Sequence, residues 1–273
     1  LVAAAASFLD ARSSGGTWHL RIDDLDPPRE VAGASDAILS SLEALSLTWD
    51  GPVTYQSRRS EIYEAACREL EIVDLAFPCG CTRREIGAGP YPGTCADGLP
   101  TGRRPRSLRA RCQGSIIVFE DRIQGSQRFR PADIEGDFII RRADGLYGYH
   151  LACVIDDAEL GVTDVVRGAD LLAATANQRH LYELLDLPLP SYAHVPVATD
   201  EHGQKLSKHS AAPPLSTTGH AHALWYALDF LGQMPPQSAW GASTSELVDW
   251  AMHHWRLERV SPIPARSVTP GAV

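Results

Sequence analysis

The chain has 273 residues, of which 44% are hydrophobic and 22% charged, so it can bury a substantial core in one large domain or two small ones. Its formal net charge of −9 excludes a simple, uniformly basic nucleic-acid-binding protein, and any RNA contact must therefore use a local basic surface. No stretch approaches the roughly 18 apolar residues of a membrane span, and six unevenly spaced cysteines without a signal peptide predict reduced thiols in a cytoplasmic protein.

The first elements predict a helix and then a strand with an acidic end. Residues 1–13 look helical, and alternating polar and apolar residues over 17–22 predict a short strand. The strand runs into Asp23, Asp24 and Asp26 in a Pro-rich turn, and ligands bind at such strand ends in open α/β sheets. One Asp is accounted for as the N-cap of a helix over residues 32–45. The others suit an ammonium group, a ribose or a metal ion, and spacing does not choose between them.

Cysteines mark residues 77–142, where the alternation of helices and strands is interrupted. Cys79, Cys81 and Cys95 predict a zinc site, because thiolates bind Zn²⁺ well and the glycine between the first two lets the backbone turn both sulfurs toward one ion. From chemistry alone, Cys112 is the better fourth ligand, since a tyrosine must give up its proton to bind. Cys67 fits a helix face and Cys153 an apolar strand, which predicts plain core thiols for both.

The same segment is rich in arginine. Ten guanidinium groups lie in or near it: Arg83, Arg84, Arg103, Arg104, Arg106, Arg109, Arg111, Arg122, Arg128 and Arg130. This concentration predicts either a surface that contacts RNA phosphates or a solvated basic loop, and the sequence leaves both interpretations open.

Helical and strand patterns alternate in the rest of the chain. Helices are predicted over residues 60–75, 174–185, 221–231 and 245–255, and strands over 138–141, 162–166 and 192–197. This order predicts an α/β fold with a mainly parallel sheet covered by helices. The polar loop at 205–209 carries Lys205 and Lys208 around Ser207, a pattern that suits a mobile clamp on a polyphosphate; a solvated surface loop is the alternative.

Three segments, in this order and spacing, resemble the class I glutamyl-tRNA synthetases. They are the acidic turn at residues 21–29, the run from 137 to 170, and the Lys-Leu-Ser-Lys loop at 205–208. The resemblance extends from residue 1 to about residue 255 and is closest to a short branch, the glutamyl-Q tRNA(Asp) synthetases. It implies a Rossmann-like parallel sheet in two parts, 1–76 and 143–215, with an inserted zinc-bearing α+β subdomain at 77–142 for the tRNA acceptor end. A helical segment at 216–273 follows, without an anticodon-binding domain.

The resemblance also implies a reaction and its glutamate site. ATP, with Mg²⁺, and L-glutamate form glutamyl adenylate, and a hydroxyl of the queuosine base at the wobble position of tRNA(Asp) then attacks it. Tyr149 and Arg167 match positions that bind glutamate. Asp23 stands where the family commonly has Glu, a departure that puts its contact with the substrate amino group in doubt. A monomer without a membrane partner is expected.

Two further ligand sets follow from the resemblance. Lys208 matches the lysine that contacts ATP, with Ser207 beside it, and Lys205 and Lys208 are the candidate catalytic residues. The family pattern of Cys-x-Cys and then Tyr-x-x-x-Cys implies one structural Zn²⁺ on Cys79, Cys81, Tyr91 and Cys95, with Cys112 as the rival fourth ligand.

The beginning of the chain departs from the family pattern, because the strand and the His-x-Gly-His-type turn that open the fold are not present. We therefore expect the sequence to be a fragment of a longer active protein, or to start at a misplaced position, and to activate glutamate weakly or not at all on its own. Two other functions stay open: a truncated or discriminating glutamyl-tRNA synthetase acting on tRNA(Glu), and a non-catalytic zinc-containing RNA-binding module.

Overall fold

The computed structural model describes residues 1–27, 31–112, 114–206 and 219–268. The α-helices are α1 (Val2–Ser13), α2 (Ala34–Ala44), α3 (Ser60–Ile72), α4 (Arg83–Ile86), α5 (Pro131–Ile134), α6 (Tyr149–Glu159), α7 (Ala174–Leu184), α9 (His220–Phe230) and α10 (Thr244–His254). Short 3₁₀ helices are η2 (Gln56–Arg58), η3 (Ala169–Leu171), η5 (Gln237–Gly241) and η6 (Leu257–Arg259). None of the described helices is long and apolar enough to cross a membrane.

The strands in the described part of the chain form four sheets. They are β1 (Arg21–Ile22), β2 (Thr54–Tyr55), β3 (Ala76–Cys79), β4 (Ser107–Ala110), β5 (Ile117–Asp121), β6 (Gly125–Phe129), β7 (Ile139–Arg141), β8 (Asp164–Gly168), β9 (Ser191–Val195), β10 (Val197–Thr199) and β11 (Ala265–Ser267). The central sheet has the order β6-β5-β9-β8, and β3-β4-β7 forms a separate antiparallel sheet. The pairs β1-β2 and β10-β11 are parallel.

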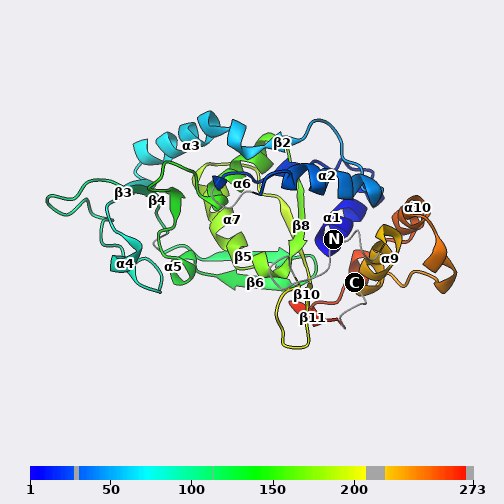
Figure 1. Ribbon diagram of the computed structural model, residues 1–273. Coiled ribbons are helices and arrows are strands. Elements are labelled where there is room, and N and C mark those ends of the chain that lie inside the picture. The colour runs from blue at the N-terminus through cyan, green and yellow to red at the C-terminus, as the bar shows by residue number, and fades with distance from the viewer. Residues whose placement is uncertain (28–30, 113, 207–218, 269–273) are drawn as a thin grey trace.

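The central sheet is parallel where β9 meets β8 and β5, and antiparallel only within the β5-β6 hairpin. Figure 1 shows this sheet in the middle of the molecule, with β3, β4 and α4 at one end and α9 and α10 at the other. The hairpin falls inside residues 77–142, which were predicted to form one inserted subdomain. That segment therefore contributes strands to two different sheets.

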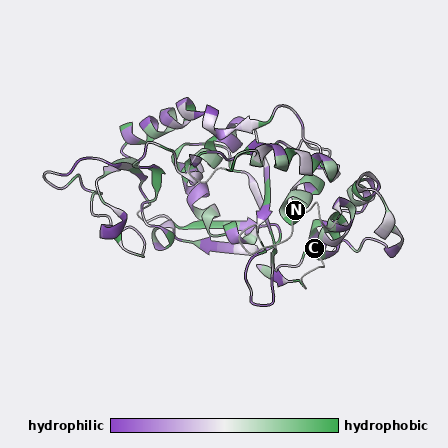
Figure 2. Ribbon diagram, viewed as in Figure 1, coloured by the Kyte–Doolittle hydropathy of each residue, from purple (hydrophilic) through white to green (hydrophobic). Residues whose placement is uncertain are grey.

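Two large apolar cores hold these layers together. One lies between α1, α9 and α10 and includes Phe8, Leu228 and Leu247. The other joins α3, α6 and α7 to the β3-β4-β7 sheet. Buried positions of α3 recur at intervals of three and four residues, as expected of a helix with one apolar face. The alternating green and purple along α3 in Figure 2 show the same pattern.

Most predicted helices lie within a few residues of the observed ones, and the differences concern strands. The strand predicted over 17–22 is shorter, because only Arg21 and Ile22 pair with β2. Cys153 does not lie on a strand as predicted: it is a buried residue of α6, whose apolar run is a helix facing the second core.

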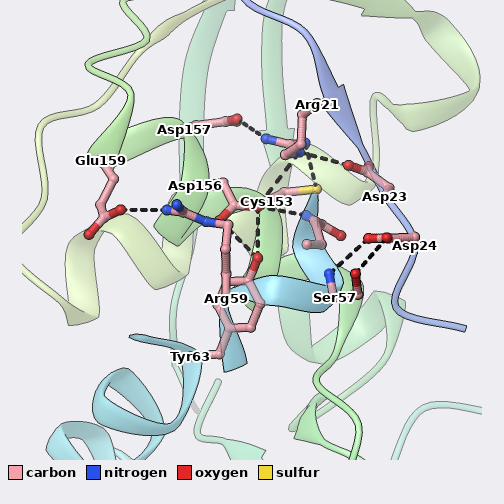
Figure 3. A network of polar contacts seen from close by, with 11 residues as sticks. Arg21, Asp23, Asp24, Ser57, Arg59, Tyr63, Cys153, Asp156, Asp157 and Glu159 are labelled. Atoms are coloured by element: carbon pink, nitrogen blue, oxygen red, sulfur yellow. Dashed lines mark hydrogen bonds and ion pairs between the residues drawn. The ribbon is translucent and has the colours of Figure 1, made fainter. Parts of the chain in front are cut away.

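A single buried carboxylate links α6 to the first part of the chain (Figure 3). Asp156, whose side chain is fully buried, accepts hydrogen bonds from Gln56 Nε2 at 2.8 Å, Arg59 Nε at 2.7 Å and the Tyr63 hydroxyl at 2.9 Å. Arg21 Nε lies 3.7 Å from the same carboxylate. Burial of a charge is stabilising only when its partners are in place, so the position of α6 depends on this network.

Replacement of Asp156 by alanine should lower the free energy of unfolding by about 3 kcal/mol, because Arg59, Gln56 and Tyr63 lose a buried acceptor together. Chemical denaturation measures the change. Glu159→Gln is the matched control on the same helix, since Glu159 pairs with the same Arg59 but its side chain is 53% exposed, and it should cost less than about 1 kcal/mol. Equal losses in the two variants would contradict this account.

Candidate active site

A cluster of charged and polar side chains gathers where β1 ends, α6 begins and β8 ends. The sequence singled out Asp23, Tyr149 and Arg167, and the structure brings them together with Arg21 and Cys153. These neighbours act on the pKa of Tyr149. Burial and the Cys153 thiol raise this pKa, the charge of Arg167 lowers it, and the charge of Asp23 raises it slightly. The phenol is therefore protonated at neutral pH and available as a hydrogen-bond donor.

Arg21 is the link between these elements (Figure 3). Its guanidinium donates to Asp23 Oδ1 at 2.7 Å, to the Cys153 sulfur at 3.3 Å, and to Asp157. Burial raises the pKa of Asp157, an effect that the charges of Arg21 and Arg167 oppose. Two guanidinium groups and two carboxylates thus share one site, and the ion pair between Arg21 and Asp157 joins β1 to α6.

The three aspartates at the end of β1 have different roles. Asp24 accepts hydrogen bonds from the backbone N–H of Ser57 at 2.8 Å and from its hydroxyl at 2.6 Å, so it fastens the turn to η2. Asp26 lies 3.6 Å from Arg142. The predicted capping of the helix over 32–45 is wrong: α2 begins after Gly33, with no side-chain cap. Only Asp23, 43% exposed, faces the cluster around Arg21.

The position of Tyr149 depends on the glycine before it. Gly148 precedes α6 so closely that a Cβ atom there would lie 2.3 Å from the carbonyl oxygen of Ile139 on β7. The start of α6 therefore lies directly against β7, and Tyr149, the first residue of the helix, is 41% exposed at the edge of the site.

Arg167, near the end of β8, is held along one edge of its guanidinium. Nε donates to His194 Nε2 at 3.2 Å and Nη2 to the Thr175 hydroxyl at 2.9 Å, while the group lies 5.6 Å from the centre of the Tyr192 ring. Within the described residues, Nη1 has no hydrogen-bond partner. The guanidinium therefore keeps its outer edge for a carboxylate or phosphate.

The lysine loop is only partly described. Lys205 pairs with Asp170 Oδ2 at 2.6 Å, and a bridge between Lys205 and Thr199 continues from β10. Asp170 follows Arg167 by three residues, so the start of the loop lies next to the end of β8. Ser207 and Lys208, predicted to contact ATP, lie outside the described residues.

A second candidate site lies beside the β3-β4-β7 sheet. The buried sulfurs of Cys79, Cys81 and Cys95 lie within 4.8 Å of one another and form a possible metal site. The Tyr91 hydroxyl is 3.4 Å from the Cys79 sulfur and 3.9 Å from that of Cys81. Cys112 does not belong to this group among the described residues; its sulfur faces the Ala110 carbonyl at 3.9 Å.

The surroundings favour the thiolate of Cys79, whereas burial and the neighbouring Cys95 and Cys79 raise the pKa of Cys81. Burial opposes ionisation of Cys79, but hydrogen bonds from Tyr91, the Cys81 backbone and Arg109 outweigh it and lower its pKa to about 7. Arg103 donates to the Cys81 sulfur at 3.4 Å. Burial and the adjacent thiols raise the pKa of Tyr91, so its phenol keeps its proton unless a cation displaces it. Soft, partly ionised sulfur donors in one buried group fit a thiophilic metal such as Zn²⁺.

The arginine-rich segment divides into internal and exposed groups. Arg109 is buried over the Tyr91 ring at 3.9 Å, and Arg103, Arg111 and Arg122 pair with acidic residues. Six others are exposed: Arg83, Arg84, Arg104, Arg106, Arg128 and Arg130. Arg83 and Arg84 begin α4, whose N-cap Thr82 follows Cys81, and the Arg106 backbone N–H donates to the Cys79 carbonyl, so exposed arginines lie around the cysteine cluster.

Sequence reasoning did not single out Arg21, Asp157 or His194. Arg21 stands on the short strand itself, and its place just before the acidic turn was an available signal. Asp157 follows a structural aspartate in a helix, and His194 lies inside an apolar strand. In the sequence alone, neither pattern distinguishes a site residue from a buried core residue whose polar atoms are hydrogen-bonded.

The chain matches a family model described as tRNA synthetases class I (E and Q), catalytic domain, over residues 2–89 and 100–217. It is 48% identical to a glutamyl-Q tRNA(Asp) synthetase of Aromatoleum aromaticum, over 100% of this chain and 88% of the relative. It is also 48% identical to the protein of the same name from Chromobacterium violaceum, over 97% of this chain and 91% of the relative.

Solved structures share the fold. A glutamate tRNA ligase from Elizabethkingia meningosepticum, crystallised in complex with its amino acid, superposes with a TM-score of 0.79 at 24% identity. The glutamate-tRNA synthetase of Elizabethkingia anophelis gives 0.80 at 24% identity. Both comparisons cover 99% of this chain, which spans 64% and 65% of the lengths of those two proteins.

Gly148→Ala should destabilise the protein by about 2 kcal/mol, because the new methyl group overlaps the Ile139 carbonyl and one element must shift. Gly241→Ala is the control, since a Cβ atom there meets nothing within 4 Å and the backbone is not left-handed. Denaturant titration of both variants measures the difference. A Gly148→Ala variant as stable as the control would show that α6 does not depend on this contact.

Proposed function

Because the chain belongs to the class I tRNA synthetases (E and Q), in the family of the glutamyl-Q tRNA(Asp) synthetases, and is a ligase, we propose that it activates L-glutamate with ATP and transfers it to queuosine in tRNA(Asp). The similarity to relatives with this name, which extends over the whole chain, is the observation that carries the proposal. The proposed acceptor is a hydroxyl of the queuosine base at the wobble position.

The site has groups suited to each end of glutamate. Arg167 offers its outer edge, including Nη1, for two parallel hydrogen bonds to a carboxylate. Tyr149 adds a neutral phenol donor, and Asp23 supplies an anionic acceptor for the ammonium group. Because Asp23 already accepts from Arg21, we propose that substrate binding takes place beside an existing ion pair rather than at a free carboxylate.

Activation requires the glutamate carboxylate to attack the α-phosphorus of ATP, with release of pyrophosphate. The queuosine hydroxyl then attacks the glutamyl carbonyl, loses its proton and displaces AMP. Negative charge grows on phosphate oxygens in the first step, and Lys205 and Lys208, with Ser207, are the proposed contacts for it together with Mg²⁺. The pairing of Lys205 with Asp170 supports a lysine loop that starts beside the glutamate site.

RNA binding is proposed for the exposed arginines around the cysteine cluster. The net charge of −9 gives no general attraction to RNA, so phosphate contacts need a local concentration of guanidinium groups. Arg83, Arg84, Arg104 and Arg106 provide one, and a bound metal would keep the surrounding backbone in place. The whole reaction would take place in the cytoplasm, where its tRNA substrate is found.

The decisive experiment is ATP-dependent transfer of labelled glutamate by the full-length gene product to three RNAs: tRNA(Asp) with queuosine, tRNA(Asp) without it, and tRNA(Glu). We expect label only on the first, and mild periodate oxidation of the queuosine diol beforehand should prevent its labelling. Label on tRNA(Glu) would instead identify a glutamyl-tRNA synthetase. Absence of label from all three would favour a non-catalytic RNA-binding module.

Zinc on Cys79, Cys81, Cys95 and Tyr91 is the second testable part of the proposal. The purified protein should retain about one zinc ion per chain, and Cys95→Ser should lose it, because one of the three clustered thiols is removed. Cys112→Ser, also at a buried thiol, is the control and should keep the metal. Metal content is measured by atomic emission after dialysis against a weak chelator.

Tyr91→Phe decides the fourth ligand. A tyrosinate ligand predicts faster loss of zinc to a chelator in this variant, with folding preserved because the ring stays in place over Arg109. Loss of zinc in Cys112→Ser together with full retention in Tyr91→Phe would assign the fourth position to Cys112 instead.

A further inference from the structure

Behind Arg167 lies a buried carboxylate and imidazole that the proposed chemistry does not use. Asp121 ends β5 and His194 lies on β9, and both side chains are fully buried. Asp121 Oδ2 lies 2.6 Å from His194 Nδ1. Its other oxygen accepts the backbone N–H groups of Ile123 at 3.0 Å, Gln124 at 2.8 Å and His194 at 3.1 Å. A carboxylate with so many donors is stably anionic, and these hydrogen bonds, with that from the imidazole, hold its pKa below the usual range against the effect of burial.

This arrangement fixes the tautomer of His194. Because Nδ1 faces an anionic acceptor, it carries the proton, and Nε2 is left as an acceptor. Nε2 in turn lies 3.2 Å from Arg167 Nε, whose N–H is always a donor. The Asp121 carboxylate therefore fixes the orientation of the Arg167 guanidinium through the His194 imidazole.

Thr175 completes the support. Its hydroxyl accepts from Arg167 Nη2 at 2.9 Å and lies 3.1 Å from both the Leu171 carbonyl, to which it donates, and His194 Nε2. The edge of the guanidinium formed by Nε and Nη2 is thus fully engaged. Among the residues that the structure describes, none bonds the edge formed by Nη1 and the second Nη2 proton, and that edge is the one available to a ligand.

We propose that Asp121, His194 and Thr175 are positioning residues that hold Arg167 in the one orientation that receives the glutamate carboxylate; this inference rests on the proposed function. They would lower the KM for glutamate without touching the substrate. The competing explanation is structural, since β5 and β9 share a single residue pair, Asp121 and Tyr192, and the Asp121 side chain reinforces that weak junction. Substitutions at His194 distinguish the positioning role from the structural role, because the hydrogen bond from the backbone N–H of residue 194 to Asp121 remains in every variant.

The test compares two isosteric changes in glutamate-dependent ATP–pyrophosphate exchange by the full-length gene product. His194→Asn keeps a donor near the place of Nδ1 but loses the acceptor for Arg167, and should raise the glutamate KM about tenfold, the loss expected for one charge-assisted hydrogen bond. His194→Gln restores an acceptor near the place of Nε2 and should stay within about threefold of the parent. The KM for ATP should change less than about twofold in both.

Thermal melting accompanies each assay. If His194→Asn does not fold, Thr175→Val, which keeps the volume and removes only the hydroxyl, decides the question and should raise the glutamate KM severalfold. Equal glutamate KM values in all folded variants, or parallel losses for glutamate and ATP, would overturn the positioning role. No glutamate-dependent exchange in the parent protein would instead overturn the proposed function, and this inference with it.

Acid pH offers a readout that a structural role would not move. The charged and titratable groups that face His194 are Asp121, Arg167 and Asp170, with the Tyr192 ring stacked on it. Burial lowers the pKa of His194, and the Arg167 charge adds to this against the opposing pull of Asp121. Protonation, which then needs a pH below the ordinary value of about 6.5, would set two donors against each other at Nε2. The glutamate KM should therefore rise in acid in the parent and stay flatter in His194→Gln; identical pH profiles would contradict the proposal.

Discussion

The placement of the site depends on one buried charge, Asp156. Its carboxylate accepts hydrogen bonds from η2, α3 and the residue between them, and Arg21, the first residue of β1, lies close by. Since Asp157, Cys153 and Tyr149 all belong to the same helix, fixing α6 against these elements also fixes every α6 residue that faces Arg167 or Arg21. A hydrophobic contact would hold the helix as firmly, but it would not set its rotation so narrowly, because apolar packing is less directional than hydrogen bonding.

Charge balance explains how an acidic protein keeps guanidinium groups at its candidate site. The overall charge is −9, yet Arg21 and Arg167 face a site in which Asp157 and Asp23 are already committed to guanidinium partners. The arginines of the predicted insertion repeat this division: of ten, Arg109 is buried and three pair with acidic residues, while the other six face solvent. What the protein can bind depends on which charged groups face solvent or the candidate site, and the net charge of the chain carries little information about it.

Short-range sequence patterns predicted most helices and the cysteine cluster, because helical periodicity and clustered thiols can both be recognised within a short stretch of sequence. They failed where partners are distant in the chain. Asp24 looked like a helix cap or ligand and is instead paired with Ser57, and Cys153 looked like a strand thiol although Arg21, 132 residues away, donates to it. No sequence pattern identified His194, because its role depends on contacts with Asp121 and Arg167 on two neighbouring strands.

The β5-β6 hairpin limits where this chain can be divided in deletion variants and chimaeras. A segment that carries the cysteine cluster and the exposed arginines would ordinarily be regarded as a removable module. Here β5, the first strand of the hairpin, ends in Asp121, which accepts hydrogen bonds from the backbone N–H and the imidazole of His194 on β9. Excision or exchange of residues 77–142 between homologues would remove an edge of the central sheet along with the module. Chimaeras should therefore retain the hairpin with its own sheet and divide the segment on either side of it.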